Sequence, residues 1–329
     1  MALDNIPDPA QDHPNRSNGS APPGAEGAAG AATELRDFLD AVADKVEKRD
    51  PVVDEVRGLL ERRIASGDVD LPRHPDSASR ILDLAKNPDA SMKDILRQVR
   101  TDAALAGRIL EVANSAAYAG SQNVYNLKMA VVRLGLTRVG ELALEMSGAT
   151  KHFQKDKRSN MLARIWKFSL ATGFACEALA KSVPSEQEEG AFLTGLFHDV
   201  ASPLVVQCIG RLERSGTIPP QADSRVLGIL NAISGEFTER LVGSWNVPKA
   251  SLEAIHLQHA KVRERRGKPL AHLLVCGKAV AAELGMGVRP VPLDYAQCRD
   301  FHFVGLEDER KVEPAREAVI DKVIQLSRK

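Results

Sequence analysis

Apolar residues recur at helical spacing along almost the whole chain after residue 32. Leu35, Phe38, Leu39 and Val42 follow this spacing, and the same pattern continues through later segments. Runs that alternate apolar and polar residues between turn signals are nearly absent. The spacing therefore predicts an all-α protein, and the low aromatic content of 4% indicates a core built mainly from aliphatic side chains.

The helices are expected to begin and end at recognisable capping residues. Asp50-Pro51, Ser91 and Asp102 each precede an apolar helical segment, and Gly135 follows one as a C-terminal stop. Ser185-x-x-Glu188 is a capping box at the start of another. Further helices are predicted at residues 160–182, 224–244, 248–262, 269–284 and 314–327.

Composition limits the classes of function. Lys plus Arg and Asp plus Glu both number 44, so no bulk charge favours nucleic acid or an anionic membrane. No stretch of about 18 apolar residues is present, and no secretory signal precedes the first helix. The four cysteines are far apart and are expected to be reduced thiols. We expect a cytoplasmic protein that binds neither membrane nor nucleic acid.

One dipeptide stands out chemically, His198-Asp199. An imidazole and a carboxylate together are suitable ligands for Mn²⁺, Fe²⁺, Mg²⁺ or Zn²⁺. Alone the dipeptide is a weak signal, so its surroundings decide its meaning. Phosphate-binding glycine motifs are missing, as is any recognisable Ser or Cys nucleophile motif.

Separated segments around this dipeptide resemble, in order, the motifs of the HDOD family, whose members are relatives of HD-type metal-dependent phosphohydrolases. The resembling segments are Leu71–Pro75, Thr101–Leu105, Arg108–Tyr118, Ala130–Gly135, Trp166–Ser169, Gly195–Asp199 and Trp245–Pro248. The resemblance implies a multi-helix HDOD domain over residues 69–285. A disordered tail (residues 1–32), an N-terminal helical extension (33–68) and a C-terminal extension with a terminal helix (286–329) are expected around it.

The departures from the family pattern are informative. The resemblance implies that catalytically competent relatives hold a metal with an earlier His, the adjacent His-Asp pair and a late Asp. Here Phe168 stands at the earlier His and Lys278 at the late Asp. A phenyl ring has no lone pair, and an ammonium group repels a divalent cation. We therefore expect no catalytic residues, no metal and no cofactor, with Phe168, His198, Asp199 and Lys278 as the remnant of the site.

Two structural hypotheses follow for the remnant. Lys278 could pair directly with Asp199 and replace the lost cation. His256 and His259, three residues apart on one predicted helix, would face the same side and could line a ligand pocket with Trp166. The plainer interpretation is that these histidines are surface or hydrogen-bonded residues and that Trp166 is core. His272 is a further candidate ligand, and the basic run from Lys261 to Lys268 is interpreted as a solvated loop.

The resemblance implies a non-enzymatic bacterial regulatory protein that passes a signal by binding a protein partner or a small ligand. Two alternatives stay open. One is an HD-type phosphohydrolase that uses His198, Asp199, His256 and His259. The other is a sensor of a cyclic dinucleotide or another nucleotide in the degenerate pocket.

Overall fold

A computed structural model describes residues 50–66, 71, 77–87, 89–118, 122–147, 158–183, 188–287 and 298–324. The tail predicted over residues 1–32, the helix predicted from Thr33 and the capping Ser185 all lie outside these ranges. Within them every regular element is a helix, which confirms the all-α prediction. The helices up to α8 are α2 Pro51–Ala65, α3 Ser77–Lys86, α4 Met92–Val99, α5 Ala103–Ala113, α6 Leu127–Ser147, α7 Ser159–Ala180 and α8 Glu188–Phe197.

The later elements complete the domain. They are α9 Ser202–Arg214, α10 Asp223–Ser244, α11 Lys249–Leu257, the 3₁₀ helix η2 Val262–Arg265, α12 Pro269–Glu283, α13 Arg299–Phe303, α14 Glu309–Val319 and the π-helical turn η3 Ile320–Ile324.

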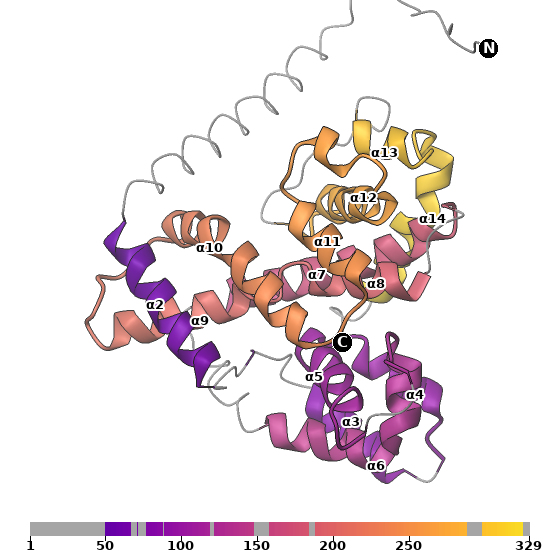
Figure 1. Cartoon of the computed structure of the whole chain (residues 1–329), viewed down its shortest axis with the longest axis horizontal. Coiled ribbons are helices and arrows are strands. Elements are labelled where there is room, and N and C mark those ends of the chain that lie inside the picture. Colours follow the sequence, from indigo (N-terminus) through magenta and orange to yellow (C-terminus); the bar gives the residue numbers. More distant parts are fainter. Residues whose placement is uncertain are drawn as a thin grey trace, which may run out of the picture. The chain divides into compact units, whose positions relative to one another are not determined.

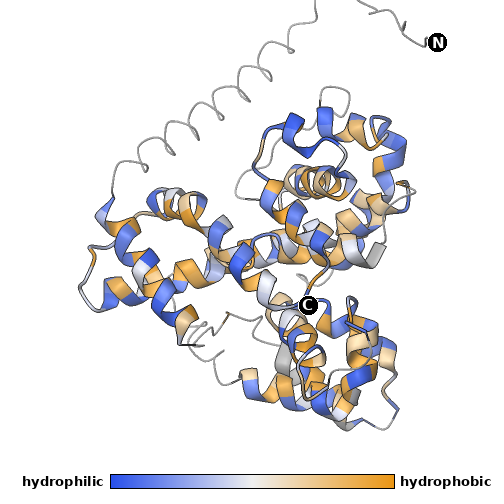
Figure 2. Ribbon diagram, in the orientation of Figure 1, coloured by the Kyte–Doolittle hydropathy of each residue, from blue (hydrophilic) through white to orange (hydrophobic). Residues whose placement is uncertain are grey.

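Apolar helix faces determine which helices pack together. Helices α3, α4 and α5 pack on α6, and α7 packs on α8, α12 and α14, while α2 and α10 pack on α9 (Figure 1). The helices are apolar toward their neighbours and polar outside, as Figure 2 shows by hydropathy. One apolar stretch, Gly190–Arg214, is long enough to cross a membrane by length and composition, but 83% of its most apolar window is buried inside the protein. The Gly190–Arg214 stretch is therefore buried to the extent that is typical of helices in a protein core.

The predicted capping residues confirm several helix starts. The Asp50 side chain accepts a hydrogen bond from the backbone N–H of Val52, and Asp102 does the same for Leu105. Ser91 forms a reciprocal capping box with Asp94 at the start of α4. Each contact satisfies an N–H group that has no partner inside its helix.

Three predicted helix boundaries differ from the structure. The helix predicted to begin at Pro314 begins at Glu309, because Asp308 caps it and Pro314 is accommodated inside. The helix predicted to run to Val262 ends at Leu257. Gly135 does end a helical segment, with a φ of 78°, but a second segment follows at once, so that α6 is kinked and not terminated.

Contacts of buried groups connect α4 and α5 to the later helices. The indole N–H of Trp166 donates to the Thr101 carbonyl at 2.8 Å. The Arg100 guanidinium pairs with Glu177 and lies over the Phe192 ring, 3.8 Å from its centroid. These contacts hold the segment from Arg100 to Asp102 against α7 and α8.

Candidate functional site

His198 and Asp199 lie in the turn between α8 and α9. His198 is only 2% exposed, and its Nδ1 lies 2.7 Å from the Gly195 carbonyl oxygen. Because a carbonyl can only accept, Nδ1 carries the proton and Nε2 keeps its lone pair. The Asp199 carboxylate accepts hydrogen bonds from the hydroxyls of Ser202 and Ser234.

Phe168 comes from α7 and packs against the histidine. Its ring meets the His198 imidazole edge to face, with centroids 5.4 Å apart and planes at 73°. The place beside His198 that the family resemblance assigns to a metal ligand is therefore filled by an apolar ring.

Lys278 comes from α12 and is held by a glutamine. Its ammonium donates to Oε1 of Gln258 at 2.8 Å, and Nε2 of Gln258 donates to the His198 carbonyl at 2.9 Å. Gln258 thus links the lysine to the backbone of the His-Asp turn. The sequence offered the neighbouring His259 as a possible pocket residue, and the structure adds Gln258 to the site.

The predicted direct ion pair between Lys278 and Asp199 is not formed. Within the described part of the chain, the Lys278 ammonium makes no salt bridge, and Asp199 is bonded to serine hydroxyls instead. The two charges still act on each other through space, since each partly offsets the effect of burial on the other's pKa. The two groups therefore interact only through space and not by a direct contact, because the Lys278 ammonium is bonded to Gln258.

Burial dominates the electrostatics of this site. It raises the pKa of Asp199 against the opposing effects of Ser202 and Lys278. Burial also lowers the pKa of Lys278 to about 8, although the negative charge of Asp199 opposes this. Asp199 and Lys278 keep part of their surface open while protein surrounds them on most sides.

The two histidines near the lysine are neutral. Burial and then the Lys278 charge lower the pKa of His198 well below its usual value. Burial, Lys278 and Arg265 lower that of His259 to about 4, although His259 exposes part of its surface. At neutral pH the site therefore combines one cation, one buried carboxyl group and two uncharged imidazoles.

The donor set does not fit a divalent metal. Phe168 has no lone pair, and Lys278 brings a positive charge where a ligand is needed. Among the described residues, no three His, Cys, Asp or Glu side chains come together as a group that could hold a metal ion. A two-donor remnant of His198 and Asp199 falls short of the three protein ligands typical of catalytic metal sites.

The other predicted site residues lie in different surroundings. His256 is exposed and contacts Glu239, with Nδ1 3.0 Å from Oε2. His259 lies beyond the end of α11, so the prediction that both histidines share one helix face was wrong. The hydrogen bond from Trp166 to Thr101 gives that indole a structural contact.

A second buried polar cluster was missed. Arg265 is only 4% exposed and makes a bidentate pair with Asp300, at 2.9 and 3.0 Å. The same carboxylate lies 2.6 Å from Nδ1 of His272. Arg265 also donates to the carbonyls of Leu257 and Ala260, which satisfies groups left open at the end of α11. The basic run is therefore only partly a solvated loop, because its central arginine is buried.

A buried His-Asp turn with a lysine beside it, set among packed helices, defines the class as an all-α protein with a His-Asp site. The HDOD domain family model matches residues 71–261, more than half of the chain. The chain belongs to the HDOD domain family.

Two solved structures of one response regulator share this fold. The MmoQ response regulator of Methylococcus capsulatus strain Bath is 23% identical, with 75% of this chain and 97% of that one covered and a TM-score of 0.58. A fragment of the same protein is 22% identical, with coverage of 74% and 94% and a TM-score of 0.53. An HDOD domain protein with unknown function from Geobacter sulfurreducens is 18% identical, with coverage of 82% and 98% and a TM-score of 0.36. No curated protein matches the chain in sequence.

Proposed function

We propose that this HDOD protein is a non-enzymatic cytoplasmic signalling component that acts by binding a partner protein. The observation that carries the proposal is the side chain set around His198 and Asp199, in which Phe168 and Lys278 take the places that the family resemblance assigns to metal ligands. Membership of the HDOD family supports a regulatory role. The fold is also that of a protein described as a response regulator.

The lysine opposes metal-dependent hydrolysis in two ways. Its positive charge repels a divalent cation at the centre of the remnant. Without such a cation, no group in the site lowers the pKa of a water molecule enough to form hydroxide at neutral pH. The remnant instead contributes a packed, hydrogen-bonded junction between α7, α8, α11 and α12.

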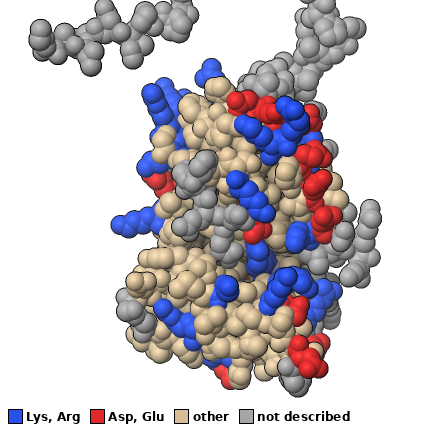
Figure 3. Space-filling view, turned by 90° about the vertical axis from the view of Figure 1, so that its right-hand side faces the viewer, with Lys and Arg blue, Asp and Glu red and all other residues tan. Residues whose placement is uncertain are grey.

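The surface supports a protein partner better than nucleic acid. Lys and Arg side chains are mixed with Asp and Glu on the face shown in Figure 3, with broad uncharged areas between them. The whole sequence has no net charge. Nucleic-acid binding depends on a concentrated positive surface, and such a surface is not evident on this face.

Metal analysis of the purified protein tests the proposal. The wild-type protein should contain only traces of Fe, Mn and Zn after growth with these metals. The double variant Phe168→His/Lys278→Asp restores the donor types that the resemblance implies and should take up metal. Circular dichroism melting would check that it is folded. Stoichiometric metal in the wild type, lost in His198→Ala, would overturn the proposal in favour of a phosphohydrolase.

Calorimetric titration addresses the remaining alternative. We expect no heat of binding with cyclic dinucleotides or mononucleotides, because the lysine is already bonded to Gln258 and the two histidines are neutral. Saturable binding that is lost in Lys278→Met but kept in the exposed Lys249→Met would make the protein a nucleotide sensor.

A further inference from the structure

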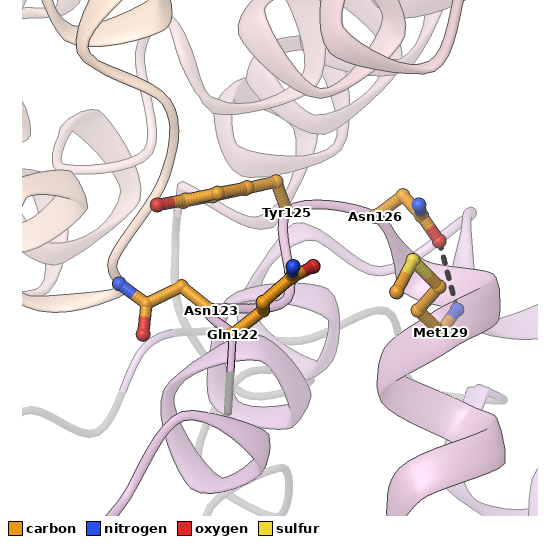
Figure 4. A pocket seen from close by; sticks show the side chains of 5 residues that line it. All are labelled: Gln122, Asn123, Tyr125, Asn126 and Met129. Carbon is orange, nitrogen blue, oxygen red and sulfur yellow. Dashed lines mark hydrogen bonds between the residues drawn. The ribbon is translucent and has the colours of Figure 1, made fainter. Parts of the chain in front are cut away.

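A rigid loop before α6 presents uncharged side chains outward. The Asn114 side chain holds it, donating to the Val124 carbonyl and accepting from the Val124 N–H, both at 2.8 Å. Arg133 donates to the Gln122 carbonyl at 2.8 Å. Asn126 accepts from the Met129 N–H at the start of the helix, also at 2.8 Å (Figure 4). The backbone of this loop is therefore fixed from inside.

The outward side of the same loop and helix is apolar and aromatic. Tyr125 is 47% exposed, Met129 48% and Val132 62%. Met129 and Val132 are three residues apart on α6, so they share one face of the helix, and Tyr125 lies in the loop just before it. Tyr125, Met129, Gln122, Asn123 and Asn126 line a cavity of about 430 Å³ (Figure 4). We call these five residues and Val132 the Tyr125 surface.

The chemistry of this surface suits a polypeptide. Exposed Tyr and Met are enriched in the cores of protein interfaces, where charged residues are depleted. Side-chain amides of Gln122 and Asn123 can both donate to and accept from a peptide backbone.

The charges beside the surface indicate the charge of the partner. Lys128, in the first turn of α6, is exposed, and Arg133 is bonded to carbonyl groups only. Across the described residues, neither cation has a carboxylate partner in a salt bridge. Lys128 is the sequence neighbour of Met129, and Arg133 bonds the backbone of Gln122, so both cations lie close to residues that line the cavity.

We infer that the Tyr125 surface binds an extended acidic segment of a partner protein, with an apolar side chain in the cavity and carboxylates beside Lys128 and Arg133. The inference rests on the proposed function in taking a protein as the partner. It also gives a role to Asn114, whose side chain fixes the loop that carries the surface.

Selection of peptides on the full-length protein tests the inference. A phage library of random linear peptides should enrich sequences with an apolar residue flanked by Asp or Glu. A synthetic peptide of the enriched sequence should bind about tenfold or more weakly to Tyr125→Ala, because exposed aromatic anchors dominate such interfaces. Lys128→Glu and high ionic strength should also weaken binding.

The matched control is Leu144→Ala, which removes an apolar side chain that is 58% exposed on the second half of α6. It should leave peptide binding unchanged. No enrichment, an enriched sequence without acidic residues, or equal loss in Leu144→Ala would overturn the inference. Self-association in sedimentation experiments that is lost in Tyr125→Ala would overturn it in favour of a second copy. Metal content tests the proposed function separately, so the two failures are distinguishable.

Discussion

Lys278 is the residue that most changes the chemistry of the His-Asp site. A buried ammonium costs free energy unless it is paired, and here one neutral amide and the distant Asp199 charge compensate it only in part. Its pKa is accordingly about 8 instead of the usual 10.5. The residue that we propose excludes a metal ion should therefore also reduce the stability of the fold at neutral pH.

This cost predicts a specific pH dependence of stability. Below about pH 8, Lys278 is charged in both states, and the folded state bears the whole cost of burying it. As pH rises from 8 toward 10.5, the folded state loses its proton first, so the cost disappears. The stability of wild type relative to Lys278→Met should therefore rise by about 3 kcal/mol over this range.

Urea unfolding at about pH 7 and about pH 10.5 measures this change. Lys249→Met is the control, since Lys249 is exposed. Its effect on the free energy of unfolding should be small and the same at both values of pH. A constant difference between wild type and Lys278→Met would show that the lysine is not desolvated as described.

Asp300 stabilises the fold through the second buried cluster. Burial alone would raise its pKa, but hydrogen bonds from His272 and Arg265 and the Arg265 charge lower it below 3.8. Asp300→Asn should reduce the free energy of unfolding by about 3–5 kcal/mol at neutral pH, because it leaves Arg265 buried without a counter-charge. The loss should become smaller as pH falls through the folded-state pKa of Asp300. Denaturant unfolding measures both, with Asp89→Asn at an exposed position as the control.

At the scale of the element, the centres of helices were predictable and several of their ends were not. Asp50, Ser91 and Asp102 are local signals, since each caps the helix that follows it directly. The end of α11 depends on Arg265, which bonds the carbonyls of Leu257 and Ala260 from outside the helix. The pairing of Arg265 with Asp300 spans 35 residues, so no local sequence pattern predicts it.

Gly135 gives a prediction for the kink in α6. Its φ of 78° lies in the left-handed region, and a Cβ added there would meet no atom within 4 Å. Gly135→Ala should therefore reduce the free energy of unfolding by about 1–2 kcal/mol through backbone strain alone. Gly243→Ala, in α10, also meets nothing within 4 Å but lies in ordinary helical backbone. It should be neutral or stabilise by up to about 1 kcal/mol. If both variants change the free energy of unfolding in urea by a similar amount, the positive φ at Gly135 is contradicted.

At the scale of the whole molecule, the sequence predicted which residues lie around the His-Asp site, but it did not predict the contacts that join them. The family resemblance placed Phe168, His198 and Lys278 around one site, and the structure joins the first two by ring packing. Gln258 connects the lysine to the His-Asp turn through contacts that span 20 and 60 residues, and no local sequence pattern predicts such contacts. The fold depends on similar long-range contacts, and one of them is the close approach of Trp245 to Gly107 in α5.

Gly107 permits that approach, and its substitution should destabilise the whole domain. A Cβ at Gly107 would lie 2.6 Å from ring atoms of Trp245, which is 5% exposed and packs edge to face on Phe197. Neither a buried indole nor a packed helix can move away without cost, so Gly107→Ala should reduce the free energy of unfolding by about 1–3 kcal/mol.

The control is Gly235→Ala, because Gly235 is a helical glycine with open space around it, and this substitution should not destabilise the protein. Because Trp245 is next to Phe197 and hence to His198, Gly107→Ala should also lower near-ultraviolet circular dichroism. An unchanged unfolding midpoint and spectrum would show that α5 and Trp245 are not in contact in solution.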